Sequence, residues 1–354
     1  NAYFQMNQRN GSRWSSTKAF LRPAMSRPNL TVLTHTHVEK LELENRDGKI
    51  RAAGVYGRIE GQASQLFKAK REVILSAGTI GSPQILQLSG IGPSGLLQDR
   101  GIQVLHDLPG VGGNLQDHLQ IRSVYKVTNT VTMNQRANSL FGKIKMGMEY
   151  ALFRSGPLTM PPSQLGAFAM SDARQVTPNI EWHVQPLSLD KFGDPLHKFN
   201  AITPSVCNLR PSSRGHVRIK SNKSDDYPAI TLNYLSTEQD RQVAIAGMRF
   251  TRKIMAAEAL ARFQPMEWKP GPELTTEEDL LKAAGDLGTT IFHPVGTCKM
   301  GRDDLAVVND RLQVQGIDCL RVIDASIMPT ITSGNTNAPT VMIAEKGAEF
   351  ILGA

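Results

Sequence analysis

Two side chains near the end of the chain could perform acid–base chemistry. His293 carries an imidazole, which titrates near neutral pH and can take a proton from a hydroxyl group. Asn335 carries a neutral amide, which can donate to a developing oxyanion without adding charge. Each residue also has a plain structural explanation, since a histidine here is more often a hydrogen-bonded core residue and a Ser-Gly-Asn sequence is typical of turns. Residue type alone leaves both alternatives open.

The elements that would position these side chains can be read from short apolar runs. Residues 72–75 form an apolar run that ends at a loop, and residues 320–323 form a second run that ends at Asp324. Runs of this length that stop at small or polar residues are typical of buried strands. A helix is expected from Ser82, because the proline that follows it is favoured in a first helical turn, and a final helix is expected from about Pro339.

The order of the expected elements predicts two kinds of domain. The first third of the chain has strand and turn signals around one helix, the middle mixes short strands and helices, and the end returns to strand, loop and helix. This order predicts an α/β nucleotide-binding domain that the C-terminal part completes, with an α+β domain inserted between its two parts. We place the segments at residues 1–120, 121–288 and 289–354.

One glycine motif resembles a dinucleotide fingerprint. Residues 90–95 read GIGPSG and match the pattern G-x-G-x-x-G. A fingerprint requires a strand before it and a helix that starts within it, whereas a predicted helix precedes this motif. Pro93 also lacks the backbone N–H that phosphate binding would use. We therefore predict a turn at these residues.

The composition is that of a globular protein without a nucleic-acid or metal-binding signature. Of 354 residues, 40% are hydrophobic and 20% are charged, and no apolar run approaches the roughly 18 residues of a membrane span. The net charge of +8 comes from scattered Lys and Arg residues, so we expect no nucleic-acid binding, while weak attraction to anionic membrane surfaces stays open. Cys207, Cys298 and Cys319 form no zinc pattern and favour a reducing compartment, so no metal is expected.

Four blocks of sequence carry a resemblance to a known family. Residues 78–92, which read GTIGSPQILQLSGIG, resemble position for position a signature of glucose–methanol–choline oxidoreductases. Three further blocks keep the order of that family and look like its loop after the first part of the flavin domain, its catalytic-histidine segment and its closing flavin segment: residues 109–118, 293–301 and 321–337. The resemblance extends over essentially the whole chain.

The resemblance implies a Rossmann-like FAD-binding domain with an inserted antiparallel-sheet substrate domain. Residues 1–120 and 289–354 would form the FAD-binding domain, and residues 121–288 the substrate-binding domain. Members of the family open with a strand, a glycine-rich turn and a helix that hold the FAD pyrophosphate, and nothing in this sequence corresponds to them. We therefore expect the chain to be a fragment; the alternative is that a separate polypeptide supplies the missing part.

The resemblance also implies roles for individual residues. His293 would face the flavin ring as the base that takes the alcohol proton, and Asn335 would hold the alcohol oxygen beside it. Asp324 and Ala325 would lie near the ribityl–phosphate part of FAD, with helix capping as the alternative role of Asp324. The residues expected to contact FAD are Val38, Gly78, Ser82, Asp324, Ala325, Asn335, Thr336 and Asn337.

Two residues are expected near the substrate, His183 and Phe292. Choline-oxidising relatives place a histidine at the position of His183, but alternation with Ile180 and Trp182 fits a packed strand equally well. Choline enzymes also carry a glutamate shortly before a GGF motif, where this chain has Gln164. Because a desolvated cation without a counter-charge is costly, a neutral primary or aliphatic alcohol is favoured over choline, although cation–π contacts could compensate in part.

The expected function is FAD-dependent oxidation of an alcohol to an aldehyde, by proton abstraction and hydride transfer to flavin N5. The alternatives are choline dehydrogenase proper, a hydroxynitrile lyase that holds FAD without using it, and a non-catalytic fragment of the same fold. The expected partners are the alcohol and an electron acceptor, which is oxygen, a quinone or a soluble carrier. We expect a cytoplasmic location and leave membrane association open, because a targeting signal is not observable in this sequence.

Overall fold

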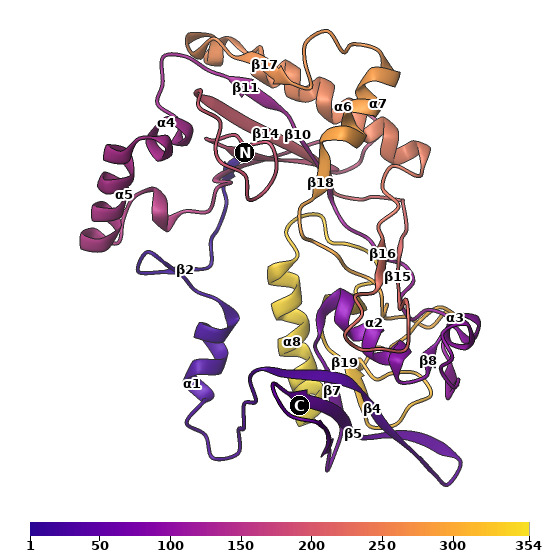
Figure 1. The fold of residues 1–354 in the computed structure, drawn as a ribbon. Helices are drawn as coiled ribbons and strands as arrows, with labels where there is room; N and C mark the ends of the chain where they lie inside the picture. Colours follow the sequence, from indigo (N-terminus) through magenta and orange to yellow (C-terminus); the bar gives the residue numbers. More distant parts are fainter. Residues whose placement is uncertain (354) are drawn as a thin grey trace. The chain divides into compact units, whose positions relative to one another are not determined.

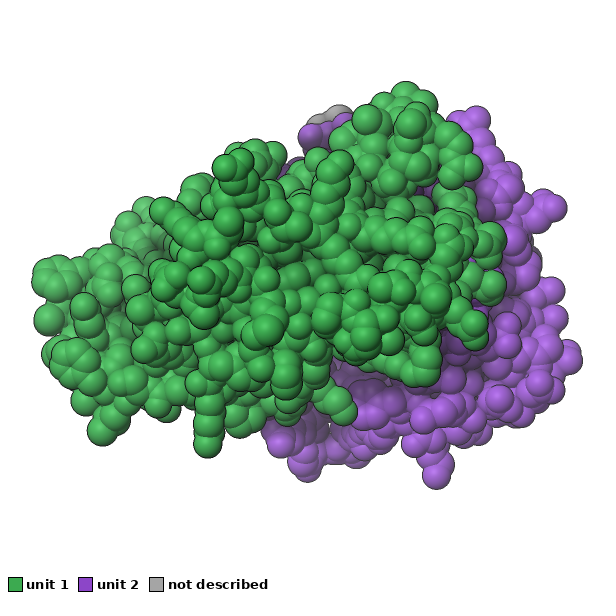
Figure 2. Space-filling view, turned by 90° about the horizontal axis from the view of Figure 1, so that it is seen from above, with its two compact units in different colours: residues 1–32, 119–209, 238–290 green, residues 33–118, 210–237, 291–354 purple. Residues whose placement is uncertain are grey.

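The computed structural model describes residues 1–353, which form two compact units (Figure 1, Figure 2). Unit 1 comprises residues 1–32, 119–209 and 238–290, and unit 2 comprises residues 33–118, 210–237 and those from Ile291 onward. These boundaries differ from the predicted segments, because residues 1–32 cluster with the middle of the chain and residues 210–237 with its outer parts. The assignment of the predicted segments to cofactor and substrate stays a prediction.

Unit 2 is built of mixed α and β elements. In chain order they are β4 (Thr36–Arg46), β5 (Lys49–Ile59), β6 (Ser64–Lys68), β7 (Val73–Leu75), α2 (Gly78–Leu88), β8 (Ile91–Gly92), α3 (Ser94–Asp99), β9 (His106–Asp107), β15 (His216–Arg218), β16 (Ala229–Thr231), β19 (Leu320–Val322) and α8 (Asn337–Leu352). β7 and β19 pair in parallel, with Leu320 opposite Val73 and Val322 opposite Leu75. The strands predicted at residues 72–75 and 320–323 are thus confirmed, and the closing segment completes a sheet that the opening segment begins.

Two helices of unit 2 begin earlier than predicted. α2 begins at Gly78 rather than at Ser82, so Pro83 lies inside the helix. α8 begins at Asn337, two residues before the predicted start at Pro339. Gly78 has a φ of +78°, which glycine adopts without a side-chain penalty. That glycine lets the chain reverse directly after β7 and enter the helix.

The glycine motif at residues 90–95 is more structured than the predicted turn. It contains β8, which pairs in parallel with β9, and the first residues of α3. A helix, α2, precedes it, as the sequence indicated. A Cβ atom at Gly90 would lie 2.5 Å from the backbone oxygen of Gln103. Close backbone packing therefore explains this glycine.

The core of unit 2 joins its antiparallel and parallel strands. A two-residue turn connects β4 and β5 of the antiparallel sheet β4–β5–β6. Asp47 and Gly48 in this turn both have positive φ, as a tight hairpin requires. Apolar residues of these strands, of α2 and of the C-terminal segment form one buried cluster, which includes Leu41, Ala52, Val73, Leu75, Leu86, Ile91, Val295, Cys298, Leu320, Val322 and Ile323. The packing of this cluster fixes the loop after β7 next to the loop after β19.

Unit 1 is built on an antiparallel sheet in the order β1-β12-β13-β14-β10-β18, and β11 and β17 extend it. Its elements are β1 (Ala2–Tyr3), β2 (Gln8–Arg9), β3 (Ser12–Arg13), α1 (Arg22–Ala24), β10 (Leu119–Arg122), β11 (Val124–Lys126), α4 (Met133–Asn138), α5 (Leu140–Phe153), β12 (Leu165–Ala169), β13 (Ile180–Gln185), β14 (Ala201–Asn208), α6 (Glu238–Met255), β17 (Met266–Lys269), α7 (Glu277–Leu287) and β18 (Gly288–Thr290). The predicted inserted antiparallel sheet is confirmed.

α6 packs on one face of this sheet. The indole nitrogen of Trp182 donates to the Thr251 hydroxyl at 2.8 Å, and the Trp182 ring lies 5.0 Å from that of Phe250. Side chains alternate along a strand, so Glu181 and His183, the neighbours of Trp182 on β13, lie on the opposite face.

α5 exposes an apolar stripe at helical spacing. The α5 stripe comprises Leu140, Phe141, Ile144, Met148 and Leu152, all of which are exposed, whereas Met146 is buried. No helix within residues 1–353 combines the length and the apolar character needed to cross a bilayer.

We predict that a side chain at position 110 lowers the stability of the fold. A Cβ atom there would lie 2.1 Å from the backbone oxygen of Leu305, so the backbone of Gly110→Ala must shift. The free energy of unfolding, measured by urea denaturation, should fall by about 1–3 kcal/mol. Gly95 in α3 is the matched control, because nothing lies within 4 Å of a Cβ at that position. Gly95→Ala should be neutral or stabilising by up to about 1 kcal/mol, and equal losses in both variants would contradict the packing.

Candidate active site

Two histidines meet in the interior of unit 2. The Nδ1 atoms of His118 and His293 lie 3.1 Å apart, and the rings are nearly perpendicular, at 84°. His118 is 0% exposed and His293 is 8% exposed. Two ring nitrogens at this distance share one proton, so one histidine donates and the other accepts.

Backbone and carboxylate bonds fix the position of His293. The N–H of Gln116 donates to the oxygen of Val295 at 3.0 Å, and the N–H of Val295 donates back at 2.9 Å. One residue along, the buried Asp117 carboxylate accepts the backbone N–H of His293 at 2.9 Å and also accepts the Tyr234 hydroxyl. A carboxylate removed from water needs such donors, so this arrangement is specific.

Asn335 lies at the second ring nitrogen of His293. The Asn335 Nδ2 atom is 3.4 Å from His293 Nε2, and Asn335 itself is exposed, just before α8. An amide nitrogen donates, so this contact is a hydrogen bond in the tautomer whose Nε2 is unprotonated and whose Nδ1 carries the proton toward His118. This tautomer leaves a basic lone pair on Nε2, beside Asn335. The structure thus brings together the two residues that the sequence singled out for acid–base chemistry.

Asp324 links the loop after β19 to the start of α2. One carboxylate oxygen accepts the N–H of Gly78 at 2.9 Å and the Ser82 hydroxyl at 2.5 Å, and the other accepts the N–H of Ser326 at 2.8 Å. The contact with Ser326 caps the short turn Ala325–Ile327. Asp324 therefore has the capping role that the sequence left open. Its bonds also connect Gly78 and Ser82 of α2 to the turn that contains Ala325, and all three residues are expected near FAD.

A cavity of about 450 Å³ opens beside this loop. Its walls come from β4 to β7 and the loop that follows, and they include Val38, Ile74 and Ala77. Apolar side chains next to loop backbone suit a planar aromatic base, whose edge needs only backbone partners. Val38, which is expected to contact FAD, lies in this wall, and that contact stays a prediction.

The beginning of α8 offers donors to the oxygens of a ligand. Thr336, the residue before the helix, is buried and its side chain caps no helix N–H. The first N–H groups of α8, starting at Asn337, have no acceptor within the helix, and the first turn contains no acidic residue. These donors suit the carbonyl or phosphate oxygens of a flavin cofactor.

The two residues expected near the substrate lie in different units. His183 lies on β13 in unit 1, is 4% exposed and stacks on Phe4 with ring centroids 4.7 Å apart. Phe292 precedes His293 in unit 2, is 66% exposed and has a φ of +64°. For a bulky residue this φ is strained, and such strain is concentrated at functional sites. Contact of either residue with a substrate stays a prediction.

Cys298 lies five residues after His293, but its thiol is buried. The residue is 0% exposed, and burial together with the Asp324 charge raises the pKa of its thiol. A thiol that stays protonated is a poor nucleophile. Cys298 therefore serves as a packing residue in the core of unit 2.

Sequence reasoning gave no role to three residues that hold His293. Asp117 and His118 end the block 109–118, and the match of that block to the family was the signal that could have pointed to them. Tyr234 belongs to no motif and reaches Asp117 across 117 positions of sequence, so only the fold reveals it.

Comparison with known proteins places the chain in a family. Sequence models described as GMC oxidoreductase match residues 1–120 and residues 211–344. The chain is 40% identical over 353 residues to an alcohol dehydrogenase [acceptor] of Pseudomonas putida, covering 99% of this chain and 63% of that protein. It is 41% identical to an oxygen-dependent choline dehydrogenase of Pectobacterium carotovorum subsp. carotovorum (strain PC1), covering 96% and 60%. The chain thus spans about three-fifths of the length of these curated relatives.

Solved structures share the fold. Pyridoxine 4-oxidase from Mesorbium loti is similar with a TM-score of 0.84 and 29% identity, covering 98% of this chain and 63% of that one. A formate oxidase of Aspergillus oryzae RIB40, whose description concerns FAD modification, is similar with a TM-score of 0.88 and 26% identity, covering 98% and 64%. These enzymes combine mixed α/β content with antiparallel sheets, as this chain does. The chain belongs to the GMC oxidoreductase family, whose cofactor is FAD.

Proposed function

We propose that the enzyme oxidises a primary or aliphatic alcohol to an aldehyde, with His293 as the base. The observation that carries this proposal is the contact of 3.4 Å between Asn335 Nδ2 and His293 Nε2, backed by His118 at Nδ1. A base and an oxygen-binding amide at one point are the two groups that removal of a hydroxyl proton requires. FAD, when bound, supplies the redox chemistry by accepting hydride from the alcohol carbon.

The proton takes a defined path in this proposal. The alcohol proton passes to His293 Nε2, which carries no proton in this tautomer. The imidazolium that forms keeps its Nδ1 proton directed at His118, and the bond from its backbone to Asp117 keeps the ring in place. Asn335 then donates to the oxygen as negative charge develops there.

Residues of unit 2 would hold the cofactor. We assign the wall containing Val38 to the adenine end, the loop of Gly78, Ser82, Asp324 and Ala325 to the ribityl–phosphate part, and the start of α8 to the flavin ring. Because the carboxylate of Asp324 accepts hydrogen bonds from Gly78, Ser82 and Ser326, we expect it to position the start of α2 rather than to bind FAD directly.

The substrate proposal rests on charge. The neutral Gln164 stands just before β12 where choline enzymes would carry a glutamate, so a quaternary ammonium would lose its counter-charge. Relatives named as alcohol and as choline dehydrogenases are nearly equal in identity, at 40% and 41%, so identity does not decide between them. A hydroxynitrile lyase would keep the same base, and bleaching of the flavin by an alcohol under anaerobic conditions distinguishes the two reactions.

We also propose peripheral contact with an anionic membrane surface. The α5 stripe is exposed and apolar, Lys143 and Lys145 lie on the same helix, and the chain carries a net charge of +8. Apolar residues flanked by cations are typical of helices that lie in the interface plane. This contact would suit a membrane-bound electron acceptor such as a quinone, with oxygen or a soluble carrier as alternatives. A cytoplasmic location stays a prediction.

Substitution of the base tests the mechanism. In the FAD-loaded enzyme, His293→Ala should slow flavin reduction by an alcohol about 100- to 10,000-fold, because no group takes the hydroxyl proton, while the flavin stays bound. Asn335→Ala should slow the same step about 100- to 1,000-fold. The rates come from stopped-flow absorbance, with bound FAD as the control. Reduction of the His293→Ala enzyme at the wild-type rate would refute the assignment.

Vesicle binding tests the α5 stripe. Ile144→Asp should lower cosedimentation of the chain with phosphatidylglycerol vesicles at least about tenfold, because a buried isoleucine contributes about 1.5–3 kcal/mol. Ile230→Asp on β16 is the matched control, since the two isoleucines are 50% and 49% exposed. Equal binding of wild type and both variants, or dimerisation through α5 in place of vesicle binding, would overturn the membrane proposal.

A further inference from the structure

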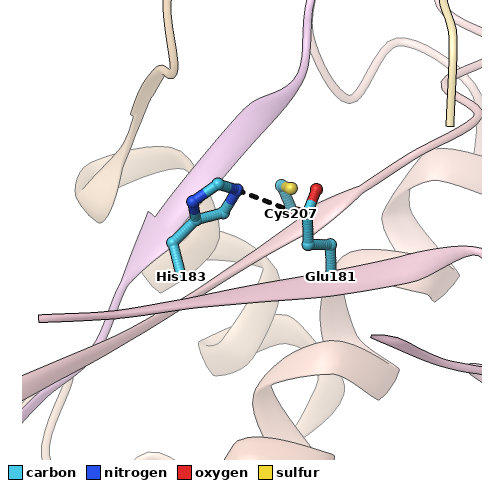
Figure 3. A group of neighbouring side chains, drawn as sticks. All are labelled: Glu181, His183 and Cys207. Atoms are coloured by element: carbon cyan, nitrogen blue, oxygen red, sulfur yellow. Dashed lines mark ion pairs between the residues drawn. The ribbon is translucent and has the colours of Figure 1, made fainter. Parts of the chain in front are cut away.

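A second cluster of buried polar side chains lies in unit 1, on the sheet face opposite α6. Glu181 and His183 are two residues apart on β13, so both point to this face, and Cys207 on β14 is the register partner of Glu181. Their ligand atoms, one from each side chain, all lie within 4.8 Å of one another. Figure 3 shows the carboxylate, the imidazole and the sulfur turned toward one point above the two strands.

The charge of Glu181 is poorly compensated as it stands. Glu181 is 0% exposed, and across residues 1–353 neither of its carboxylate oxygens has a hydrogen-bond partner. His183 Nε2 lies 3.3 Å from one of these oxygens, but the two atoms are not aligned as a hydrogen bond, and this nitrogen also lacks one within the described residues. Unsatisfied polar atoms and charges buried in this way cost several kcal/mol.

Neighbouring cations do not offset this charge. Arg122, on the adjacent strand β10, donates to Gln185 at 3.2 Å and lies over the ring of Phe192 at 4.3 Å. Its Nη2 thus has another partner, whereas Nη1 has no hydrogen-bond partner within residues 1–353. Within these residues no ion pair joins the guanidinium to Glu181. A positive charge placed among Glu181, His183 and Cys207 would satisfy the carboxylate and the imidazole together.

We propose that Glu181, His183 and Cys207 form a binding site for a divalent cation of the zinc class. Oxygen, nitrogen and sulfur donors in one set are typical of zinc and exclude magnesium or calcium, which require oxygen ligands. Two ligands about 2.0–2.2 Å from zinc at the tetrahedral angle lie about 3.3–3.5 Å apart, and the Glu181–His183 separation is 3.3 Å. Rotation of the Cys207 side chain would close the remaining distance.

Binding would also balance the charge. The thiol proton of Cys207 leaves to solvent, the thiolate binds the metal, and the two negative charges of Glu181 and Cys207 offset the two positive charges of the ion. No electron is transferred. A water molecule would fill the fourth position, and Ser205, the buried register partner of His183 on β14, has a hydroxyl group that lacks a partner within residues 1–353 and could receive its hydrogen bond.

Cobalt substitution tests the site without reference to catalysis. The chain is produced with zinc or with cobalt in the medium and dialysed, and the metal content is measured by mass spectrometry. We expect about one ion per chain and, with cobalt, a thiolate-to-cobalt charge-transfer band and the visible bands of tetrahedral coordination. Absence of retained metal, or octahedral cobalt bands without the thiolate band, would overturn the proposal.

Single variants assign the ligands. Cys207→Ser should abolish the charge-transfer band and lower metal affinity at least about tenfold, whereas Cys319→Ser, which removes a thiol that is only partly buried, should change neither. Glu181→Gln provides a second variant of nearly equal size, and it should lower affinity while the thiolate band persists. Circular dichroism checks that each variant folds. An unchanged band in folded Cys207→Ser would refute the site, and so would its loss in Cys319→Ser.

Discussion

The paired bridge between Gln116 and Val295, with the Asp117 carboxylate beside it, is the constraint on which the candidate active site depends. It joins two loops that are far apart in sequence and sets the backbone of His293 at a fixed point. The Asp117 carboxylate is buried and accepts the backbone N–H of His293, and the Tyr234 hydroxyl donates to it from a third segment. The orientation of one imidazole is thus determined by the packing of unit 2 rather than by its own loop.

A buried carboxylate also positions the residues of unit 2 that are expected to contact the cofactor. A single carboxylate, Asp324 after β19, receives donors from Gly78 and Ser82 at the start of α2. Thr79 of α2 then exchanges hydrogen bonds with the segment that carries His293. Its hydroxyl donates to the Pro294 oxygen at 2.7 Å, and its backbone oxygen accepts the Thr297 hydroxyl at 2.6 Å. Hydrogen bonds therefore connect the residues expected to hold FAD with the loop that carries His293. A substitution that displaces one of these segments would therefore also displace the other.

Sequence patterns were most informative where the physics is local. The runs at residues 72–75 and 320–323 predicted two strands correctly. β19 is buried throughout, as such runs indicate, whereas Ile74 in β7 is 42% exposed. Helix starts were less predictable, since α2 begins at the glycine Gly78 and not at the proline-containing turn. The role of Tyr234 could not be predicted, because no local sequence pattern indicates its contact with Asp117. The cluster of Glu181, His183 and Cys207 also escaped the search for zinc patterns, because strand register and not sequence spacing brings its members together.

The central claim is the tautomer of His293, because a proton on Nδ1 is what leaves Nε2 unprotonated and able to act as a base. Nitrogen-15 NMR of the imidazoles, in FAD-loaded enzyme labelled at histidine and at a pH where His293 is neutral, reports directly which ring nitrogen carries the proton. The account predicts a protonated Nδ1 and an unprotonated Nε2 for His293, with the Nδ1 proton lost from this hydrogen bond in His118→Phe. A proton on Nε2 in the wild-type enzyme would contradict it.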